Sequence, residues 1–353
     1  MIKYSKSIFG KINDTIIYEF TLANSSGMSV SFLNYGATIS KLFFNTEEGP
    51  IDIVLGFNTL KGYLQEKNRF FGSTIGRYAN RIEGAKFILN EKEYFLTKNH
   101  FNNCLHGGKT GFDKIIWDSI YIKEKNMIKF SYFSKNFDNG FPGNLNVSVL
   151  YTLSENNQLT INYNASTDYP THVNLTNHSY FNISGNNGEN MNTHLLQIFS
   201  NNFLEINNNL IPTGNCINVS NTFYDFRTPK PIDNQKLITN YDHNWIIDNY
   251  TPNQLNKMTN LYNKNSKIFL EILSTYPGLQ FYGGNNLDGT LFDTKQSIVY
   301  NKYSGICLEP QFFPNSPNMK EFPSTLLTPE KNYDHTIIYK LSIVNRQHKV
   351  DKI

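Results

Sequence analysis

Apolar and polar residues alternate along many short stretches of this sequence, and this alternation constrains the fold more than any other feature. Every second residue is apolar in residues 28–32, 128–132, 145–153 and 159–165. Successive side chains of a strand point to opposite faces of a sheet, so each stretch is predicted to be a strand with one face in the core. Ser154-Glu-Asn-Asn157 separates the last two stretches, which predicts an antiparallel hairpin.

The rest of the chain adds more strands and few helices. Lys267–Leu273, Ser297–Tyr300 and Thr336–Val344 are rich in β-branched and aromatic residues and are predicted strands. Thr59–Gln65 and Thr251–Tyr262 are the helix candidates, the second because its leucine and methionine residues recur at helical spacing. Many strands and little helix predict an all-β fold, a large sandwich or barrel-like structure. No linker divides the sequence, so residues 1–353 are expected to form a single domain.

Charge and cysteine content argue against several classes of protein. The net charge is only +3, which does not indicate a partner such as nucleic acid or a membrane surface. The three cysteines are odd in number and far apart, which favours free thiols in a reducing compartment. No apolar run is long enough to span a bilayer, and the first residues do not resemble a secretory signal. A cytoplasmic protein is therefore expected.

Two residues are candidates for proton transfer. His178 lies at the end of a predicted strand among polar residues, in Asn174-Leu-Thr-Asn-His-Ser-Tyr-Phe-Asn182, and its ordinary pKa is near neutrality. Glu309 follows an apolar strand and precedes a proline-rich turn, a position that tends to raise a carboxyl pKa and suits a general acid or base. A purely structural alternative is that Glu309 pairs with an arginine such as Arg81.

Further polar residues have the chemistry to bind an oxygen-rich ligand. Arg77 and Arg81 bracket a glycine-rich run that also contains Asn80, and either arginine could instead be structural. His106 precedes two glycines, which allow its loop to fold tightly over a ligand. Asp242 could accept hydrogen bonds from ligand hydroxyls or cap a loop. Gln280 alternates with apolar neighbours, so it faces away from the core or into a site.

A metal site is the weaker interpretation of these residues. It would combine Cys104 with His106, His172, His178 or His243. No such pair has the spacing of a common zinc signature, so no metal and no cofactor is predicted.

Taken together, these pieces resemble the aldose 1-epimerase (galactose mutarotase) family. The similarity extends from about Phe32 to about Leu341 and rests on many motifs in register. The principal ones are Gly76-Arg-Tyr-Ala-Asn-Arg-Ile82, Leu105-His-Gly-Gly108, Asn177-His-Ser-Tyr-Phe-Asn182, Asp242-His-Asn244, Gly278-Leu-Gln280 and Leu308-Glu-Pro-Gln311. Two positions depart from the family pattern: Asn315 stands where Asp is common, and Gly283 where Thr or Ser is common.

The resemblance implies a large antiparallel β-sandwich with an open sugar-binding cleft. It implies that Glu309 is the general base and His178 the general acid of a reaction that interconverts the α and β anomers of hexoses such as D-galactose and D-glucose. By the same resemblance, the sugar is bound by Asn80, Arg81, His106, Tyr180, Asp242 and Gln280. The chemistry needs one acid and one base, expected on opposite sides of the sugar ring, and no metal, nucleotide or redox cofactor.

Alternatives on the same fold remain open at this point. A hexose-6-phosphate mutarotase would need a basic phosphate pocket, and no Lys/Arg cluster other than Arg77 and Arg81 is apparent. A non-catalytic sugar-binding or sugar-sensing protein would not need both Glu309 and His178. The expected partner is a small aldohexose, and the protein could be a monomer or a homodimer.

Overall fold

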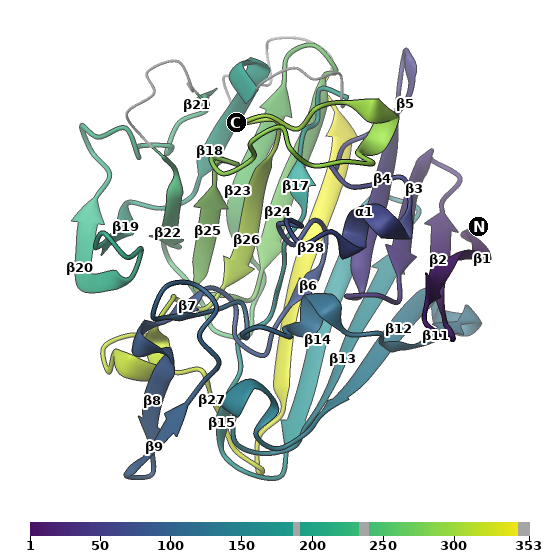
Figure 1. The fold of residues 1–353 in the computed structure, drawn as a ribbon. Coiled ribbons are helices and arrows are strands. Elements are labelled where there is room, and N and C mark those ends of the chain that lie inside the picture. Colours follow the sequence, from purple (N-terminus) through teal and green to yellow (C-terminus); the bar gives the residue numbers. More distant parts are fainter. Residues whose placement is uncertain (186–190, 233–239, 345–353) are drawn as a thin grey trace.

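The computed structural model describes residues 1–185, 191–232 and 240–344. Figure 1 shows antiparallel sheets packed face to face, with little helix. The largest sheet has nine strands, and strands distant in sequence are neighbours in it. In sheet order they are β11 (Asp118–Ile122), β12 (Met127–Ser134), β13 (Leu145–Leu153), β14 (Gln158–Thr167), β28 (Tyr333–Ile343), β24 (Ile268–Ser274), β23 (Asn256–Asn263), β18 (His194–Ile198) and β21 (Lys230–Pro231).

Two further sheets cover one face of this large sheet. The five-stranded sheet runs in chain order, with β1 (Lys3–Ile12), β2 (Thr15–Ala23), β3 (Met28–Leu33), β4 (Thr38–Thr46) and β5 (Gly49–Asp52). The six-stranded sheet has the order β17 (Tyr180–Phe181), β26 (Ile306–Gln311), β25 (Gly278–Tyr282), β22 (Asp242–Ile246), β19 (Asn202–Ile206) and β20 (Pro212–Asn218).

Short elements connect the large sheets. Four two-stranded pairings are formed by β6 (Thr74–Ile75) with β16 (Thr176–Asn177), β7 (Arg81–Ile82) with β10 (Cys104–Leu105), β8 (Lys86–Leu89) with β9 (Lys92–Phe95), and β15 (Thr171–His172) with β27 (Leu326–Leu327). Within the described residues the α-helix is α1 (Leu60–Leu64). Single 3₁₀ turns are η1 (Glu83–Ala85), η2 (Phe112–Lys114), η3 (Lys123–Lys125), η4 (Asp138–Gly140), η5 (Met191–Thr193), η6 (Lys295–Ser297) and η7 (Ser316–Asn318).

The main hydrophobic core lies between the nine-stranded sheet and the two smaller sheets. Phe32 of β3 contacts Tyr151 of β13, with ring centroids 4.4 Å apart. Phe181 of β17 meets Tyr339 of β28 edge to face at 5.2 Å. All four side chains are fully buried. Aromatic pairs of this kind bury large areas, so they hold the layers together.

The six-stranded sheet has one face in this core and a second face that carries polar side chains. Trp245, Leu279 and Leu308 point into the core and are buried. Their strand neighbours Gln280 and Glu309 lie opposite each other in register, on the other face. Every residue of β26 is nevertheless buried, so this second face is also covered by protein.

The structure confirms most of the strand predictions. The all-β sandwich, the hairpin of β13 and β14, the strands β24 and β28 and the short helix α1 are present where the sequence predicts them. The strand predicted over Ser297–Tyr300 is wrong, because Ser297 is the last residue of η6 and residues 298–300 lie in a loop. The prediction of one domain over residues 1–353 stays a prediction.

The helix predicted over Thr251–Tyr262 is also wrong, and a β-bulge explains the error. From Asn256 onward this stretch belongs to β23, and its pairing with β24 shifts between Lys257 and Thr259. Met258 is the extra residue of the bulge, so it and Leu261 are both buried although they are three residues apart. The bulge therefore produces an apolar spacing that is typical of a helix. A separate finding is that no helix in the described part of the chain is long and apolar enough to cross a membrane.

The core contact between Phe32 and Tyr151 gives a stability prediction. Phe32→Ala removes a fully buried ring and leaves a cavity, so the free energy of unfolding should decrease by about 3–5 kcal/mol. Urea unfolding followed by tryptophan fluorescence would measure this change. The control is Phe133→Ala on β12, because Phe133 is 49% exposed and its removal should change stability by about 0.5 kcal/mol or less. Equal losses in both variants would contradict this location of the core.

Candidate functional site

His178 lies where the chain changes its strand partner. The preceding strand β16 pairs with β6, and the following strand β17 pairs with β26. The His178 backbone bonds to both residues of the Gly72–Ser73 segment: its N–H donates to Ser73 O (3.0 Å), and its carbonyl accepts from Gly72 N–H (2.9 Å). The predicted strand end is thus two very short strands with His178 between them. These pairings fix the imidazole over the outer face of the six-stranded sheet.

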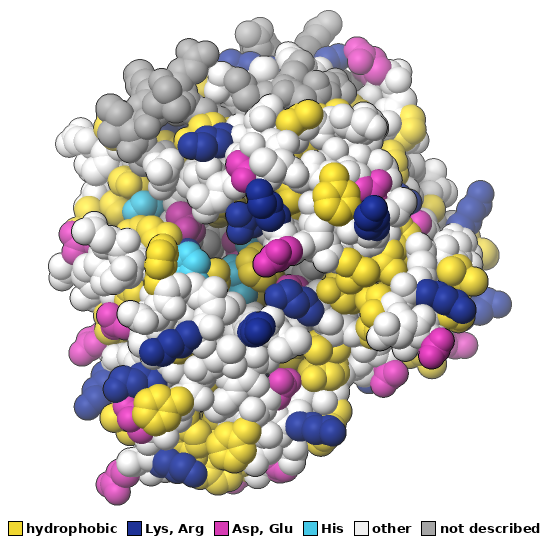
Figure 2. Space-filling model, in the orientation of Figure 1, with side chains coloured by type: hydrophobic (Ala, Val, Ile, Leu, Met, Phe, Trp, Pro, Cys, Tyr) yellow, Lys and Arg dark blue, Asp and Glu magenta, His cyan; other side chains and the backbone are white. Residues whose placement is uncertain are grey.

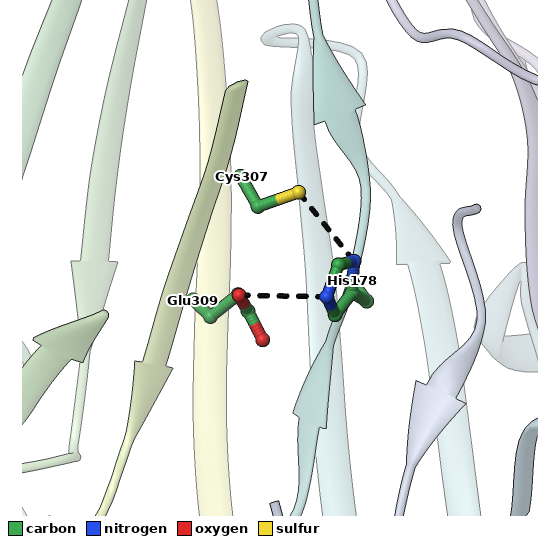
Figure 3. A group of neighbouring side chains, drawn as sticks. All are labelled: His178, Cys307 and Glu309. Carbon is green, nitrogen blue, oxygen red and sulfur yellow. Dashed lines mark hydrogen bonds and ion pairs between the residues drawn. The ribbon is translucent and has the colours of Figure 1, made fainter. Parts of the chain in front are cut away.

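Glu309 reaches the same place from β26. Its carboxylate Oε1 lies 3.7 Å from Nε2 of His178, and both side chains are buried (Figure 3). Cys307, two residues earlier on the same strand face, also lies beside the imidazole, with Sγ 3.4 Å from Nδ1. The structure therefore brings together two residues that are distant in sequence and were predicted independently as proton-transfer groups.

Burial sets the protonation of this pair. It raises the pKa of Glu309 well above 4.5, the negative charge of Asp242 raises it further, and Arg81 opposes both effects. Burial also lowers the pKa of His178 to about 4. Each group is therefore shifted toward its neutral form. A carboxyl and an imidazole with such perturbed pKa values in one site are typical of acid–base catalysis.

A polar network lies beside the pair on the same sheet face. Asp242 accepts a hydrogen bond from Gln280 Nε2 at Oδ1 (2.7 Å) and one from Arg81 Nη2 at Oδ2 (3.4 Å). Arg81 also donates to the side-chain oxygen of Asn80 (3.3 Å). The structural alternative for Glu309 is not observed, because the ion-pair partner of Arg81 is Asp242. Four of the predicted sugar-binding residues are thus in one connected group.

His106 approaches the pair from the loop after β10. Its N–H donates to Asn80 O (3.0 Å), and its Nδ1 accepts from Asn80 N–H (3.1 Å). The next residue, Gly107, has a φ of +83°, and a Cβ there would overlap the carbonyl of Gly76. Burial lowers the pKa of His106 well below 6.5, and the neighbouring charges of His178, Arg81 and His100 add to this effect. A neutral ring whose Nδ1 accepts a bond carries its proton on Nε2, so His106 offers a donor.

Several buried polar atoms of this group have no hydrogen-bond partner among the described residues. They are Glu309 Oε2, Gln280 Oε1, Arg81 Nε and His100 Nδ1. Buried polar atoms are normally paired with protein or water, so a cluster of unpaired donors and acceptors indicates a place for a polar ligand. Figure 2 shows histidine and acidic side chains recessed in a hollow, with lysine and arginine side chains around it.

Tyr180 and Arg77 have different surroundings from the other candidates. Tyr180 packs behind His178, and its hydroxyl donates to the carbonyl of Arg69 (3.0 Å), so its contact with a ligand stays a prediction. Arg77 is buried away from this group and donates to the backbone carbonyls of Ser134, Lys135, Pro142 and Gly143 and to the Ser134 hydroxyl. Of the two arginines, Arg81 is therefore the one that faces the site.

The potential metal ligands that the structure groups together differ from the set that the sequence suggests. In the described part of the chain, the group of three potential ligands is His178, Cys307 and Glu309, and it does not contain Cys104. Cys307 faces Nδ1 of the imidazole, whereas Glu309 faces Nε2. One ligand atom from each of these three residues lies within 4.8 Å of the other two. Cys104 packs instead in an apolar cluster with Tyr78 and Phe87.

Three residues of this site were not predicted from the sequence. Phe70 contacts both site histidines, with its ring centroid 4.7 Å from His106 and 5.6 Å from His178. His100 is close enough to Arg81 and Asp242 for their charges to affect its pKa, which burial lowers. Neither belongs to a recognisable motif. Cys307 could have been found, because it precedes Glu309 by two residues and strand periodicity places both on one face.

Sequence comparison identifies relatives over most of the chain. The profile of the aldose 1-epimerase family matches residues 18–340. The galactose mutarotases of Bos taurus and Homo sapiens are each 38% identical to this chain over 349 residues, which is 97% of this chain and 100% of theirs. The aldose 1-epimerase of Escherichia coli is 33% identical over 330 residues, covering 91% of this chain and 94% of that protein.

Solved structures agree with the sequence comparison. A galactose mutarotase/aldose epimerase homologue from C. elegans superposes with a TM-score of 0.84 at 31% identity, covering 92% of this chain and 98% of that one. The galactose 1-epimerase of Lactobacillus acidophilus also superposes with a TM-score of 0.84, at 27% identity over 98% of this chain and all of that one.

The surroundings of Arg77 predict that it stabilises the fold without acting on a ligand. Arg77→Leu leaves several buried carbonyls without their donor, so the free energy of unfolding should decrease by roughly 3 kcal/mol. The ligand affinity of the folded fraction should not change. Urea unfolding and a binding measurement would test both. The control is Arg227→Leu, since Arg227 is 39% exposed in its ion pair and its loss should change stability much less.

Proposed function

The chain belongs to the aldose 1-epimerase family, and from that premise we propose that it interconverts the α and β anomers of a free hexose such as D-galactose or D-glucose. The observation that carries the proposal is the buried pair of Glu309 and His178, 3.7 Å apart. The interconversion opens and closes a hemiacetal ring, which requires one group to remove a proton and another to donate one.

The proposed roles are those of general base for Glu309 and general acid for His178. The hydroxyl oxygen O1 and the ring oxygen O5 are bonded to the same carbon, C1. A separation of 3.7 Å leaves no room for a pyranose ring between the two groups. It supports an approach to O1 and O5 from one side of C1, in place of the expected approach from opposite sides of the ring.

The protonation states of Glu309 and His178 support this mechanism. Burial favours a carboxylic acid beside a neutral imidazole, and this form differs from a carboxylate–imidazolium pair only in the position of one proton. Starting from the ion pair, Glu309 takes the O1 proton and His178 gives its proton to O5 as the C1–O5 bond breaks. Ring opening thus returns the pair to the form that burial favours. After rotation about the C1–C2 bond, the reverse transfers close the ring as the other anomer.

The remaining predicted residues are proposed to bind and orient the sugar. Unpaired Arg81 Nε and Gln280 Oε1 are a donor and an acceptor suited to hydroxyl groups. The Nε2–H of His106 is a further donor, and Asp242 and Asn80 offer acceptors beside Arg81. Tyr180 is proposed as a wall of the sugar site through its ring. The group holds both charged and neutral hydrogen-bonding side chains, as expected for a polyhydroxylated ligand.

We also propose a cytoplasmic location and a protein that needs no cofactor. The free cysteines Cys104, Cys216 and Cys307 support a reducing compartment. The proposed partner is the aldohexose alone, and a single domain acting as a monomer or homodimer would suffice, because the pair and its network come from one chain.

The proposed roles predict the effect of removing either proton-transfer group. Glu309→Gln and His178→Asn should each lower kcat by about 10²–10⁴-fold, because a positioned acid or base contributes on this scale. Sugar affinity should stay within a few-fold of wild type, since the binding network is intact. Polarimetry of freshly dissolved α-D-galactose or α-D-glucose, together with calorimetric titration of the sugar, would measure both quantities. Wild-type turnover by either variant would contradict the role of that residue.

The lowered pKa of His178 predicts an unusual acid limb of the pH–rate profile. The working pair carries one proton, and a second proton on His178 would leave no base beside the sugar. Because that pKa is about 4 and not 6.5, kcat/KM should remain constant as the pH falls through 6.5 and should decrease near pH 4. Polarimetric rates, corrected for the spontaneous reaction at each pH, would test this expectation. A decrease centred near pH 6.5 would show that His178 titrates as an exposed histidine.

A further inference from the structure

Phe70, in the loop between α1 and β6, lies against both histidines of the site. Its ring centroid is 4.7 Å from that of His106, edge to face, and 5.6 Å from that of His178. The Phe70 side chain is only partly buried, whereas both histidines are buried. Figure 2 shows apolar surface beside the histidine side chains in the hollow. An accessible aromatic surface is thus present next to the proposed acid.

The backbone holds this ring in a strained position. Phe70 has a φ of +66°, in the left-handed region that bulky residues rarely adopt. Its carbonyl accepts a hydrogen bond from Ser73 N–H (3.0 Å), and Ser73 O in turn accepts from His178 N–H (3.0 Å). The next residue, Phe71, is fully buried and stacks on Tyr180. Strained residues that their surroundings hold in place are concentrated at functional sites, so this conformation indicates a role for the Phe70 ring.

The proposed proton transfers orient a hexose relative to this ring. Glu309 acts at O1 and His178 acts at O5, and both oxygens are bonded to C1. The other carbon bonded to O5 is C5, which in a hexose carries the exocyclic carbon C6. Because the Phe70 ring lies against His178 and His106, it is on the O5 side of the pair. The part of the sugar nearest to this ring is therefore the C5–C6 edge.

We propose that Phe70 is a binding residue that packs against C5–H and the C6 methylene of the sugar, so that the site selects hexoses over pentoses. This inference rests on the proposed function, because it uses the positions assigned to O1 and O5. The C–H groups of a sugar and an aromatic ring are apolar, and their contact removes apolar surface from water. Phenylalanine has no hydrogen-bonding side-chain group, so Phe70 recognises the carbon C6 and not its hydroxyl.

Two sugars isolate the contribution of this carbon. D-Fucose has the ring configuration of D-galactose with a methyl group at C5, and L-arabinopyranose has the same ring configuration without that methyl group. 6-Deoxy-D-glucose and D-xylose form the equivalent pair for the gluco configuration. One carbon in an apolar contact typically changes kcat/KM by roughly 10-fold or more. The wild-type protein should therefore have a kcat/KM for D-fucose roughly 10-fold above that for L-arabinose, as measured by polarimetry.

The variant Phe70→Ala tests the contact directly. It should lower kcat/KM for D-fucose roughly 10-fold, mainly by raising KM, and change that for L-arabinose little, so that the ratio of the two approaches 1. The matched control is Phe137→Ala, since Phe137 also has a positive φ, +62°, and is 55% exposed, but packs near Tyr94. It should leave both values unchanged. Phe70→Gly suits the left-handed backbone and should give the same result if Phe70→Ala does not fold.

The ratio separates a binding role from a structural one. If Phe70 only holds the histidines in place, its removal lowers kcat/KM for both sugars by the same factor, and the unchanged ratio would overturn the inference. A wild-type ratio near 1 would overturn it as well. Hexose turnover with either result leaves the proposed function standing, whereas a wild-type protein without turnover of D-galactose or D-glucose contradicts that function. Calorimetric titration of the same two sugars then gives the ratio of affinities without turnover.

Discussion

The burial of Glu309 beside His178 is the interaction on which the rest of the site depends. A carboxyl and an imidazole 3.7 Å apart in a buried site are both shifted toward their neutral forms. Burial is the largest cause of each shift, so the surrounding strands and loops determine the chemistry as much as the two residues do. Any change that lets water reach the pair would bring both pKa values back toward ordinary values and reduce the preference for the neutral form.

The sandwich supplies this burial by using the two faces of one sheet differently. Trp245, Leu279 and Leu308 anchor the six-stranded sheet on the core, which makes its strands rigid. Gln280 and Glu309 then project from the opposite face at fixed spacing. The short strand β7, which carries Arg81, and the loops that carry His106 and His178 cover that face. The polar residues of the site come from segments far apart in the sequence, and the core behind the sheet holds them together.

Much of this arrangement can be predicted from the sequence, because strand alternation is a local signal. It identifies the sandwich strands, and it assigns Gln280 to the face opposite its apolar neighbours. Alternation fails where the local rule is broken, as at the bulge around Met258, where an extra residue produces helical spacing. It also gives no sign of Phe70 or His100, because their places in the site arise from loop packing over the sheet. Nor can it distinguish Arg77 from Arg81, which lie in the same short motif and differ only in what tertiary contacts surround them.

The charges around the pair are arranged so that burial stays the dominant effect. Asp242 raises the pKa of Glu309 and Arg81 lowers it, and these two residues are each other's ion-pair partners. Their opposing influences partly cancel at Glu309, and the remaining shift is set by the dry surroundings. Arg81 therefore acts on two quantities at once, the affinity for a hydroxylated ligand and the pKa of Glu309.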